Sequence, residues 1–277
     1  MLRINQWYKN CLIFFGLIFD RKFFSFRFDI LAILGFFMVC LVSSSNYIIN
    51  DVLDRSDDKL NNIKENFIST KRSLNIAVSI AIALIIVAVF ISWFISIMFF
   101  ICIVLISVFG QIYNFIARKK IVADILVLIC IYILRTYSGY YLVDSAPNGL
   151  LILPLIILIM YLIFIKKRSI LLALGEEKAI AFRKSYKFYS LKRTQLSIKI
   201  LAVILAVFYF IYLLLNEKFN PWLLYSTYPF AVFLIYSFSS ITAKQPEMGI
   251  FLWKLFKIHR ILLASIIITI IYAIAIL

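Results

Sequence analysis

Apolar segments long enough to cross a membrane recur along this chain of 277 residues and restrict the folds open to it. A spanning helix needs about 20 mostly apolar residues, and lipid leaves the backbone no alternative to hydrogen bonds made within a helix. Nine segments approach that length: 5–19, 30–49, 75–94, 96–116, 122–143, 149–165, 197–215, 222–241 and 261–277. The sequence therefore predicts an all-α fold, a polytopic membrane bundle of about nine transmembrane helices that forms one domain over residues 1–277.

The distribution of basic residues predicts the orientation of these helices. With a cytoplasmic N-terminus, the inner segments hold 24 of the 29 Lys and Arg residues, and the outer loops hold four. Such an excess marks the cytoplasmic side of a membrane protein. We therefore expect a multi-pass protein of the plasma (inner) membrane with four cytoplasmic loops, at residues 50–74, 117–121, 166–196 and 242–260.

The net charge of +16 does not indicate nucleic-acid binding, because the orientation alone accounts for the basic loops. The charge instead favours contact with anionic membrane lipids or with an anionic lipid substrate. All four cysteines lie in apolar segments without a CxxC pair, and His259 is the only histidine in the sequence. This composition argues against a histidine-based metal site and against a Ser/His catalytic triad.

An acidic cluster follows the second apolar segment, in the sequence NYIINDVLDRSDD. Asp51, Asp54 and Asp58 are three and four residues apart, so on a helix their carboxylates lie on one face, which Asn46 and Asn50 extend. Crowded carboxylates repel each other unless a cation lies between them, and Mg²⁺ completed by substrate phosphates is the usual one. A solvated helix end is the alternative, but so many carboxylates beside a membrane helix are costly without a cation.

Two charged residues lie inside the fifth apolar segment. Asp124 and Arg135 are 11 residues apart, close to three helical turns, so they share one helix face with Gly139, which allows close packing there. Charges at these depths are costly unless they face a polar cavity. Either they form structural ion pairs with another helix, or Asp124 faces a metal or substrate while Arg135 holds a phosphate or orients an acidic residue.

Further basic and polar residues lie at the cytoplasmic ends of the predicted helices, where they could clamp phosphates. Positively charged flanks required by the orientation account for many of them equally well. The segment from residue 166 to 193 mixes apolar and basic residues, which predicts short amphipathic helices with a break at Gly175. The candidates for substrate binding in this group are Lys9, Asn10, Arg118, Lys167, Arg168, Arg183 and Tyr189.

These motifs resemble those of the UbiA-type prenyltransferase superfamily, in which an NDxxDxxxD motif follows the second helix. That acidic motif is here Asn50, Asp51, Asp54 and Asp58. Within the superfamily the chain most resembles the decaprenyl-phosphate phosphoribosyltransferase branch. The branch has a QWxKN opening (Gln6, Trp7, Lys9, Asn10), a Tyr-x₄-(Lys/Arg)-x₅-Asp stretch (Tyr113, Arg118, Asp124), an LRxxxG stretch (Leu134, Arg135, Gly139) and an R-x₅-Y stretch (Arg183, Tyr189).

The resemblance implies a Mg²⁺-dependent transferase that works at the cytoplasmic face. Phosphoribosyl diphosphate would bind with Mg²⁺ at the acidic motif, a polyprenyl phosphate would attack the anomeric carbon of the ribose, and diphosphate would leave. Metal binding is implied for the four residues of the acidic motif, and catalysis for its three aspartates and Asp124. Substrate binding is implied for Lys9, Asn10, Asn46, Asn50, Arg118, Arg135, Lys167, Arg168, Arg183 and Tyr189.

The partners expected from the resemblance are phosphoribosyl diphosphate, a polyprenyl phosphate or diphosphate, and membrane lipids, without nucleic acid. A homo-oligomer is compatible with the sequence. Residues 61–73 depart from the branch, which usually has an RPxxSG-like stretch there, and this leaves a choice of donor and acceptor open.

The main alternative is an enzyme that moves a polyprenyl group from its diphosphate to an aromatic or other small acceptor. Such enzymes usually carry a second acidic motif, DxxxD, after the sixth helix, where this chain has only Glu176 and Glu177. A non-catalytic lipid-binding scaffold would not need the intact acidic motif. A transporter would be expected to have Gly- or Pro-broken helices in matching halves, which the sequence does not suggest.

Overall fold

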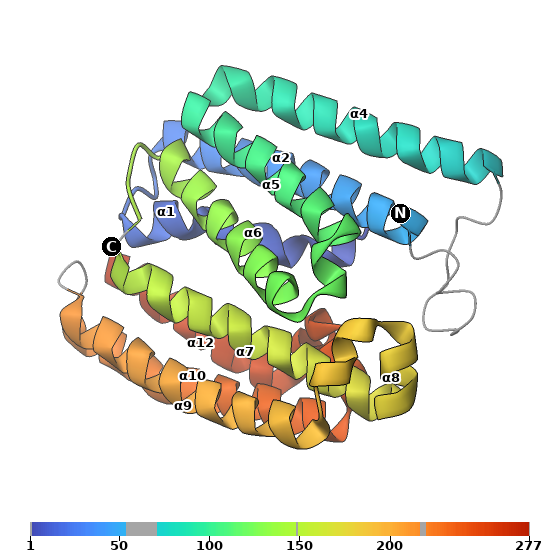
Figure 1. Ribbon diagram of the computed structural model, residues 1–277. Coiled ribbons are helices and arrows are strands. Elements are labelled where there is room, and N and C mark those ends of the chain that lie inside the picture. The colour runs from blue at the N-terminus through green and yellow to red at the C-terminus, as the bar shows by residue number, and fades with distance from the viewer. Residues whose placement is uncertain (1, 54–70, 148, 217–219, 277) are drawn as a thin grey trace. The chain divides into compact units, whose positions relative to one another are not determined.

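The computed structural model describes residues 2–53, 71–147, 149–216 and 220–276 (Figure 1). Within these ranges nearly every residue lies in a helix and no strand occurs, which confirms the predicted all-α class. Contacts between residues divide the chain into two compact units, Met1–Pro147 and Asn148–Leu277. A single domain over the whole chain stays a prediction.

The first unit is built around α2. Its elements are η1 (Ile4–Phe14), α1 (Phe15–Phe19), α2 (Phe26–Leu53), α4 (Lys71–Ile95), α5 (Ile97–Phe115), η2 (Ala117–Lys119) and α6 (Ile121–Leu142). Helix α2 contacts α4, α5, α6 and η1 (Figure 1). This central place matters because the C-terminal end of α2 carries the start of the acidic motif.

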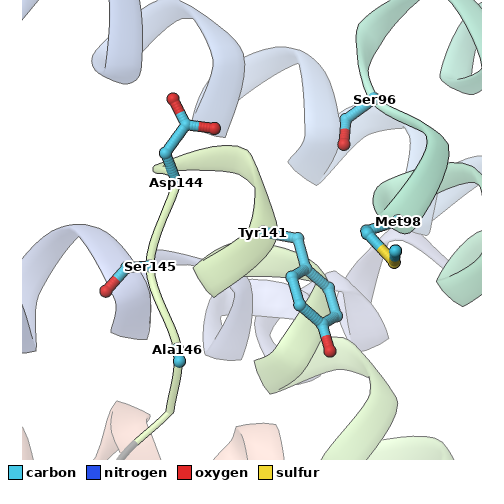
Figure 2. Close-up of a pocket in the computed structure, with 6 residues that line it drawn as sticks. All are labelled: Ser96, Met98, Tyr141, Asp144, Ser145 and Ala146. Atoms are coloured by element: carbon cyan, nitrogen blue, oxygen red, sulfur yellow. The ribbon is translucent and has the colours of Figure 1, made fainter.

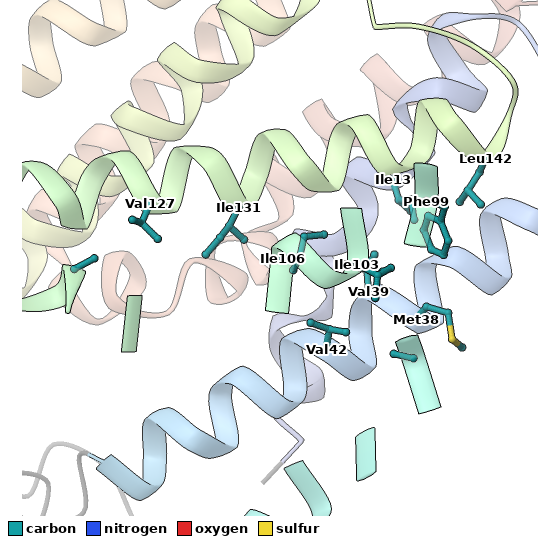
Figure 3. Close-up of a cluster of buried hydrophobic side chains, with 12 residues drawn as sticks. Ile13, Met38, Val39, Val42, Phe99, Ile103, Ile106, Val127, Ile131 and Leu142 are labelled. Carbon is teal, nitrogen blue, oxygen red and sulfur yellow. The ribbon is translucent and has the colours of Figure 1, made fainter. Parts of the chain in front are cut away.

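The core of the first unit is apolar and includes side chains of η1, α2, α5 and α6 (Figure 3). Val39 and Val42 of α2 belong to one buried cluster with Ile103 and Ile106 of α5, and all four are fully buried. Because lipid is as apolar as these side chains, helices in a membrane associate mainly through close packing rather than exclusion of water. The core therefore fixes α2 against α5, and with it the end of α2 that bears polar residues.

Glycines bring the backbone of the N-terminal segment against α6. A Cβ atom on Gly139 of α6 would lie 1.8 Å from the carbonyl oxygen of Ile13. A Cβ on Gly16 would lie 2.8 Å from the carbonyl oxygen of Gly139. The close packing that the sequence predicts at Gly139 is confirmed, and η1 with its polar residues is held against α6 as a consequence.

Helix α4 docks through small residues. Its fully buried residues are Ala77, Ala81, Ala88 and Ser92, which fall on one stripe of the helix. Ser45 Oγ of α2 donates a hydrogen bond to the carbonyl oxygen of Ala81 (2.8 Å). Large side chains elsewhere on the helix, such as Phe90, are exposed, as expected for a helix surface in contact with lipid.

The second unit consists of longer helices joined by short helical turns. Its elements are α7 (Gly149–Leu174), α8 (Glu176–Phe182), η3 (Lys184–Phe188), α9 (Leu191–Leu215), α10 (Pro221–Lys244), α11 (Pro246–Ile250), η4 (Leu252–Lys257) and α12 (His259–Ile276). Helix α7 packs on α9 and α11, and α10 packs on α12 and α9. Tyr161 Oη of α7 donates to the carbonyl oxygen of Ile235 in α10 (2.5 Å), which links these two helices.

The predicted spans agree with the helices in most places. Seven helices of the described chain are long and apolar enough to cross a membrane: α2, α4, α5, α6, α7, α9 and α10. The first predicted span is a 3₁₀ helix followed by the short α1, and the last is the shorter apolar helix α12. The count of nine spans stays a prediction.

Helix α7 continues past the predicted span, which ends at residue 165, into the segment predicted to be helical up to Gly175. It reaches Leu174, because residues 165–174 contain no Gly or Pro. It ends at Gly175, whose φ of +79° lies in a region that favours glycine. The break predicted at Gly175 is thus confirmed, and α8 begins directly after it.

Candidate functional site

The C-terminal end of α2 carries the part of the acidic motif that the structure describes. Asn46, Asn50 and Asp51 lie there, whereas Asp54 and Asp58 fall outside the described residues. The side chains of Asn46 and Asn50 bond to α5, but Asp51 bonds to the segment before η1. Neighbouring helical residues point about 100° apart. Asp51 therefore faces a different neighbour from Asn46 and Asn50, and the predicted single face stays a prediction, because Asp54 and Asp58 fall outside the described residues.

Amide side chains join α2 to α5 at this end. Gln111 Nε2 donates to Asn46 Oδ1 (2.6 Å), and Asn114 Nδ2 donates to the carbonyl oxygen of Asn46 (3.0 Å). Asn50 Nδ2 donates in turn to Asn114 Oδ1 (3.2 Å). Gly110 makes room for them, since a Cβ there would lie 2.0 Å from Asn46 Nδ2. We call Asn46, Asn50, Gln111 and Asn114 the amide ladder; it engages the nitrogen of Asn50 and leaves its oxygen as the end suited to a cation.

An arginine from the start of the chain reaches Asp51. Arg3 Nη2 forms an ion pair with Asp51 Oδ1, and its guanidinium lies over the ring of Tyr47, 5.4 Å from the ring centroid. Tyr47 precedes Asp51 by about one helical turn, so both contacts use one face of α2. Ser44 Oγ donates to the carbonyl oxygen of Leu2 (2.9 Å), which fixes the backbone next to Arg3. The acidic motif thus has a basic side chain built against it.

Polar side chains continue along α2 into the apolar part of the unit. Arg135 Nη2 of α6 donates to Ser43 Oγ (3.1 Å), and Ser43 Oγ donates to Asn10 Oδ1 (3.2 Å). Asn10 Nδ2 donates to Cys40 Sγ (3.1 Å), so both ends of this amide bind α2. Ser43 lies about 12 Å from Asp51 along the helix axis. Hydrogen-bonding groups therefore line α2 for two turns beyond the acidic motif.

Arg135 is a buried cation for which the described residues supply no ion-pair partner. It is 5% exposed, and its guanidinium lies 5.1 Å from the centroid of the Tyr132 ring. The ion pairs found within the described ranges do not include Arg135, and its Nε has no hydrogen-bond partner there. A buried charged donor in this state is costly, which favours the interpretation that Arg135 holds an anionic group.

The other candidates of the first unit are more scattered. Asp124 is 1% exposed and lies about 16 Å from Arg135 along α6, so the two share a helix face without sharing a contact region. Lys9 is half-buried, donates Nζ to Gln6 Oε1 (3.1 Å), and is close enough to Arg135 to interact electrostatically. Arg118 is half-buried in η2. The structure therefore gathers Lys9, Asn10 and Arg135 and leaves Asp124 apart from Arg135.

In the second unit, a lysine is enclosed by aromatic rings. Lys167 is 7% exposed, and its Nζ lies 5.0 Å from the ring centroids of both Tyr186 and Tyr189. The two tyrosines come from η3 and its C-cap, so the helical break at the end of α7 brings them back over the lysine. Arg183 is half-buried at the start of the same turn. Two of the four candidates in this unit, Lys167 and Tyr189, are therefore in contact near the end of α7.

Arg168 faces another helix of the same unit. Its Nη2 donates to Thr242 Oγ1 (2.9 Å) and to a backbone carbonyl one turn earlier in α10 (2.6 Å). The next residue, Ser169, packs where Gly249 of α11 leaves space, since a Cβ on that glycine would lie 1.9 Å from Ser169 Oγ. Arg168 therefore ties α7 to α10.

A cavity of about 400 Å³ lies at the other end of the first unit (Figure 2). Its lining residues are Ser96, Met98, Tyr141, Asp144, Ser145 and Ala146. Asp144 pairs with Arg27 at the start of α2 (3.6 Å), whereas Asp51 lies near the end of that helix. These points are about 36 Å apart along α2. The cavity is therefore separate from the acidic motif.

The donor atoms at the end of α2 fit a hard cation. Asn50 offers an amide oxygen and Asp51 a carboxylate, and oxygen donors of this kind suit Mg²⁺. No group of three or more His, Cys, Asp or Glu residues comes together in the described part of the chain. The described residues thus hold one part of the predicted ligand set, and Asp54 and Asp58 would complete it.

A model of the UbiA prenyltransferase family matches residues 12–274. The chain belongs to this family. The predicted superfamily is thereby confirmed, and with it a membrane transferase of the prenyltransferase type. No curated protein matches the sequence.

Solved UbiA structures have the same fold. A UbiA homolog from Archaeoglobus fulgidus bound to DMAPP and Mg²⁺ has a TM-score of 0.68 at 16% identity, over 98% of both chains. The homolog bound to GPP and Mg²⁺ has a TM-score of 0.67 at 16% identity, over 97% of this chain and 98% of the other. A digeranylgeranylglyceryl phosphate synthase has a TM-score of 0.61 at 18% identity, over 100% and 96%. These structures support the membrane-bundle architecture.

Several residues of the candidate site are not predicted from the sequence: Arg3, Ser43, Tyr47, Gln111 and Asn114. Gln111 and Asn114 did carry a signal, because they are polar, three residues apart and inside an apolar segment, which marks a buried polar helix face. Arg3 carried none, since a basic residue near a cytoplasmic end satisfies the orientation rule without any further role.

Proposed function

We propose that this UbiA-family protein transfers a 5-phosphoribosyl group from phosphoribosyl diphosphate to a polyprenyl phosphate. The observation that carries the proposal is the polar lining of α2 beyond the acidic motif, where Asn10, Ser43 and Arg135 are hydrogen-bonded. A phosphorylated sugar offers hydroxyls and a second phosphate to such groups. An isoprenoid tail attached to a diphosphate would instead need apolar neighbours, because unpaired polar groups in contact with it are costly.

The chain's own residues then divide the work of binding the donor. Arg135 and Lys9 bind the 5-phosphate, and Asn10 with Ser43 orients the ribose. Mg²⁺ held by Asn50, Asp51, Asp54 and Asp58 would neutralise charge on the departing diphosphate. An oxygen of the lipid phosphate bonds to the anomeric carbon as the bond from that carbon to diphosphate breaks. This oxygen needs no strong base, because it is already anionic.

The remaining predicted residues keep their proposed roles. Asp124 acts in catalysis, and substrate binding falls to Asn46, Arg118, Lys167, Arg168, Arg183 and Tyr189. Among these, Lys167 has the most suitable surroundings for an anionic group, because its ammonium lies near two phenol rings. Arg168 contributes by holding α7 against α10 through Thr242.

The second candidate function is transfer of a polyprenyl group from its diphosphate to an aromatic or other small acceptor. The observation that favours it is the family itself, in which the Archaeoglobus fulgidus homolog was solved with DMAPP or GPP. Against it, residues 166–196 contain no DxxxD motif.

The test is an assay of detergent-solubilised protein with Mg²⁺, a polyprenyl phosphate and phosphoribosyl diphosphate labelled in the ribose. We expect label in the organic phase, lost with EDTA and reduced at least about 100-fold by Asp51→Asn. Arg27→Ala removes an ion pair at the other end of α2 and should leave the rate unchanged. If labelled polyprenyl diphosphate reacts with an aromatic acid and the phosphoribosyl donor does not react, the second function replaces the first.

A further inference from the structure

We propose that Arg3 serves as a stand-in cation, which neutralises Asp51 while the donor site is empty and moves to the diphosphate when donor and metal bind. The proposal rests on the proposed function in one respect, that Asp51 holds a cation beside a diphosphate. Both candidate reactions share that feature, so the identity of the transferred group does not enter.

The Asp51 carboxylate belongs to the acidic motif, yet it forms an ion pair with the Arg3 guanidinium. A guanidinium and a divalent cation repel each other at one carboxylate unless a further anion lies between them. A diphosphate is such an anion, and it accepts the paired hydrogen bonds that arginine donates. Arg3 is therefore a competitor of the metal before the diphosphate arrives and a ligand of the diphosphate afterwards.

The backbone near Arg3 is held in place by its neighbours. Ser44 Oγ accepts a hydrogen bond from Trp7 Nε1 (3.1 Å) and donates one to the carbonyl oxygen of Leu2 (2.9 Å). Arg3 itself has a φ of +46°, in the left-handed region that residues with a side chain rarely adopt. The Leu2 carbonyl before Arg3 and the Trp7 side chain after it are thus both bonded to Ser44 of α2, and the long Arg3 side chain can move without breaking either bond.

The Arg3 guanidinium lies over the ring of Tyr47, 5.4 Å from the ring centroid. A guanidinium that lies over an aromatic face within about 6 Å of the ring centroid is attracted to it. Tyr47 therefore keeps the charge near the acidic motif while the ion pair with Asp51 is exchanged for contacts with the diphosphate.

These contacts predict a coupling between two ligands. Without diphosphate, Arg3 opposes binding of a metal at Asp51; with diphosphate, it no longer does. Binding of one ligand then strengthens binding of the other by the same factor, as linkage requires. The consequence is that the site discriminates against a free metal ion and takes up the metal together with its donor.

The experiment is a titration of the purified full chain with Mn²⁺, followed by electron paramagnetic resonance, with and without inorganic pyrophosphate. Without pyrophosphate, we expect Arg3→Ala to bind Mn²⁺ about three- to fivefold more tightly than the wild type. Pyrophosphate should tighten Mn²⁺ binding in the wild type by a larger factor than in Arg3→Ala. Arg3→Lys keeps the charge and should behave between the two.

Arg27→Ala is the matched control, because Arg27 also pairs with an aspartate, Asp144, at the far end of α2 (3.6 Å). It should bind Mn²⁺ as the wild type does. The proposal is overturned if Arg3→Ala binds free Mn²⁺ no more tightly than the wild type, or if pyrophosphate helps both equally. If Asp51→Asn leaves Mn²⁺ binding unchanged, the metal does not bind at Asp51 and the proposed function fails as well. If Asp51→Asn loses Mn²⁺ binding while Arg3→Ala binds as the wild type does, only the role of Arg3 is overturned.

Discussion

Asn114 is the residue on which the orientation of Asn50 depends. It accepts a hydrogen bond from Asn50 Nδ2 and donates one to the carbonyl oxygen of Asn46. Asn114→Leu keeps the branching and the number of heavy atoms of the side chain but removes both bonds, so the Asn50 amide can turn its nitrogen toward the cation. Residues that orient metal ligands typically change metal affinity or activity about 10- to 100-fold when mutated. We expect the Mg²⁺ concentration for half-maximal transfer to rise by such a factor.

The control for Asn114→Leu is Ser92→Ala in α4. Ser92 is also fully buried, but its hydroxyl donates only to Val89 of its own helix (2.8 Å). A comparable loss of thermal stability in the two variants, with a changed Mg²⁺ dependence in Asn114→Leu alone, would support the role of Asn114 in orienting the Asn50 amide. An unchanged Mg²⁺ dependence in Asn114→Leu would mean that the amide ladder serves only to pack α2 against α5.

At the residue scale, the sequence predicted which residues have suitable functional groups better than it predicted which residues they contact. Helical spacing was enough to place Asn50 and Asp51 at the end of one helix. It could not show that they face different neighbours, because that depends on which helices pack on either side of α2. The contacts of Asn10 could not be predicted for the same reason. Its amide binds Ser43 and Cys40, and only the packing of η1 on α2 creates these two contacts.

At the scale of elements, the crossing of η1 and α6 depends on a glycine. Gly139→Ala would place a methyl group 1.8 Å from the carbonyl oxygen of Ile13, so the backbones must separate. Overpacking of this kind costs about 1–3 kcal/mol. We expect a lower midpoint in thermal unfolding of detergent-solubilised protein, whereas Gly149→Ala, with nothing within 4 Å of its new methyl, should leave the midpoint unchanged. Equal midpoints for the two variants would contradict the close crossing.

Most elements could be predicted from hydropathy, because a long apolar run in lipid has no alternative to a helix. The exceptions have physical causes. The segment 5–19 contains polar residues as far as Asn10 and forms a 3₁₀ helix, which no apolar period announces. Helix α7 extends beyond its apolar span, because the basic residues that follow residue 165 can stay helical until Gly175 ends the helix.

At the scale of the whole molecule, composition alone predicted the class, and the charge asymmetry predicts the orientation. The orientation can be tested with single cysteines in a variant that lacks the four native ones. Ala146 and Lys187 are both exposed, and the prediction places them on opposite sides of the membrane. In right-side-out vesicles, an impermeant maleimide should label Ala146→Cys directly and Lys187→Cys only after permeabilisation. The reverse pattern would invert the protein and move the acidic motif outside the cytoplasm.

The buried small residues of α4 restrict which positions of this helix can change in evolution. Ala81 and Ala88 set how closely α4 approaches the rest of its unit, so larger side chains there would push the helix away. Residues on the exposed surface, such as Phe90, make few contacts within the unit and can be exchanged for other apolar types. Adaptation to a colder habitat or to a membrane of different thickness can therefore change the exposed residues of α4 without changing the residues of the candidate site.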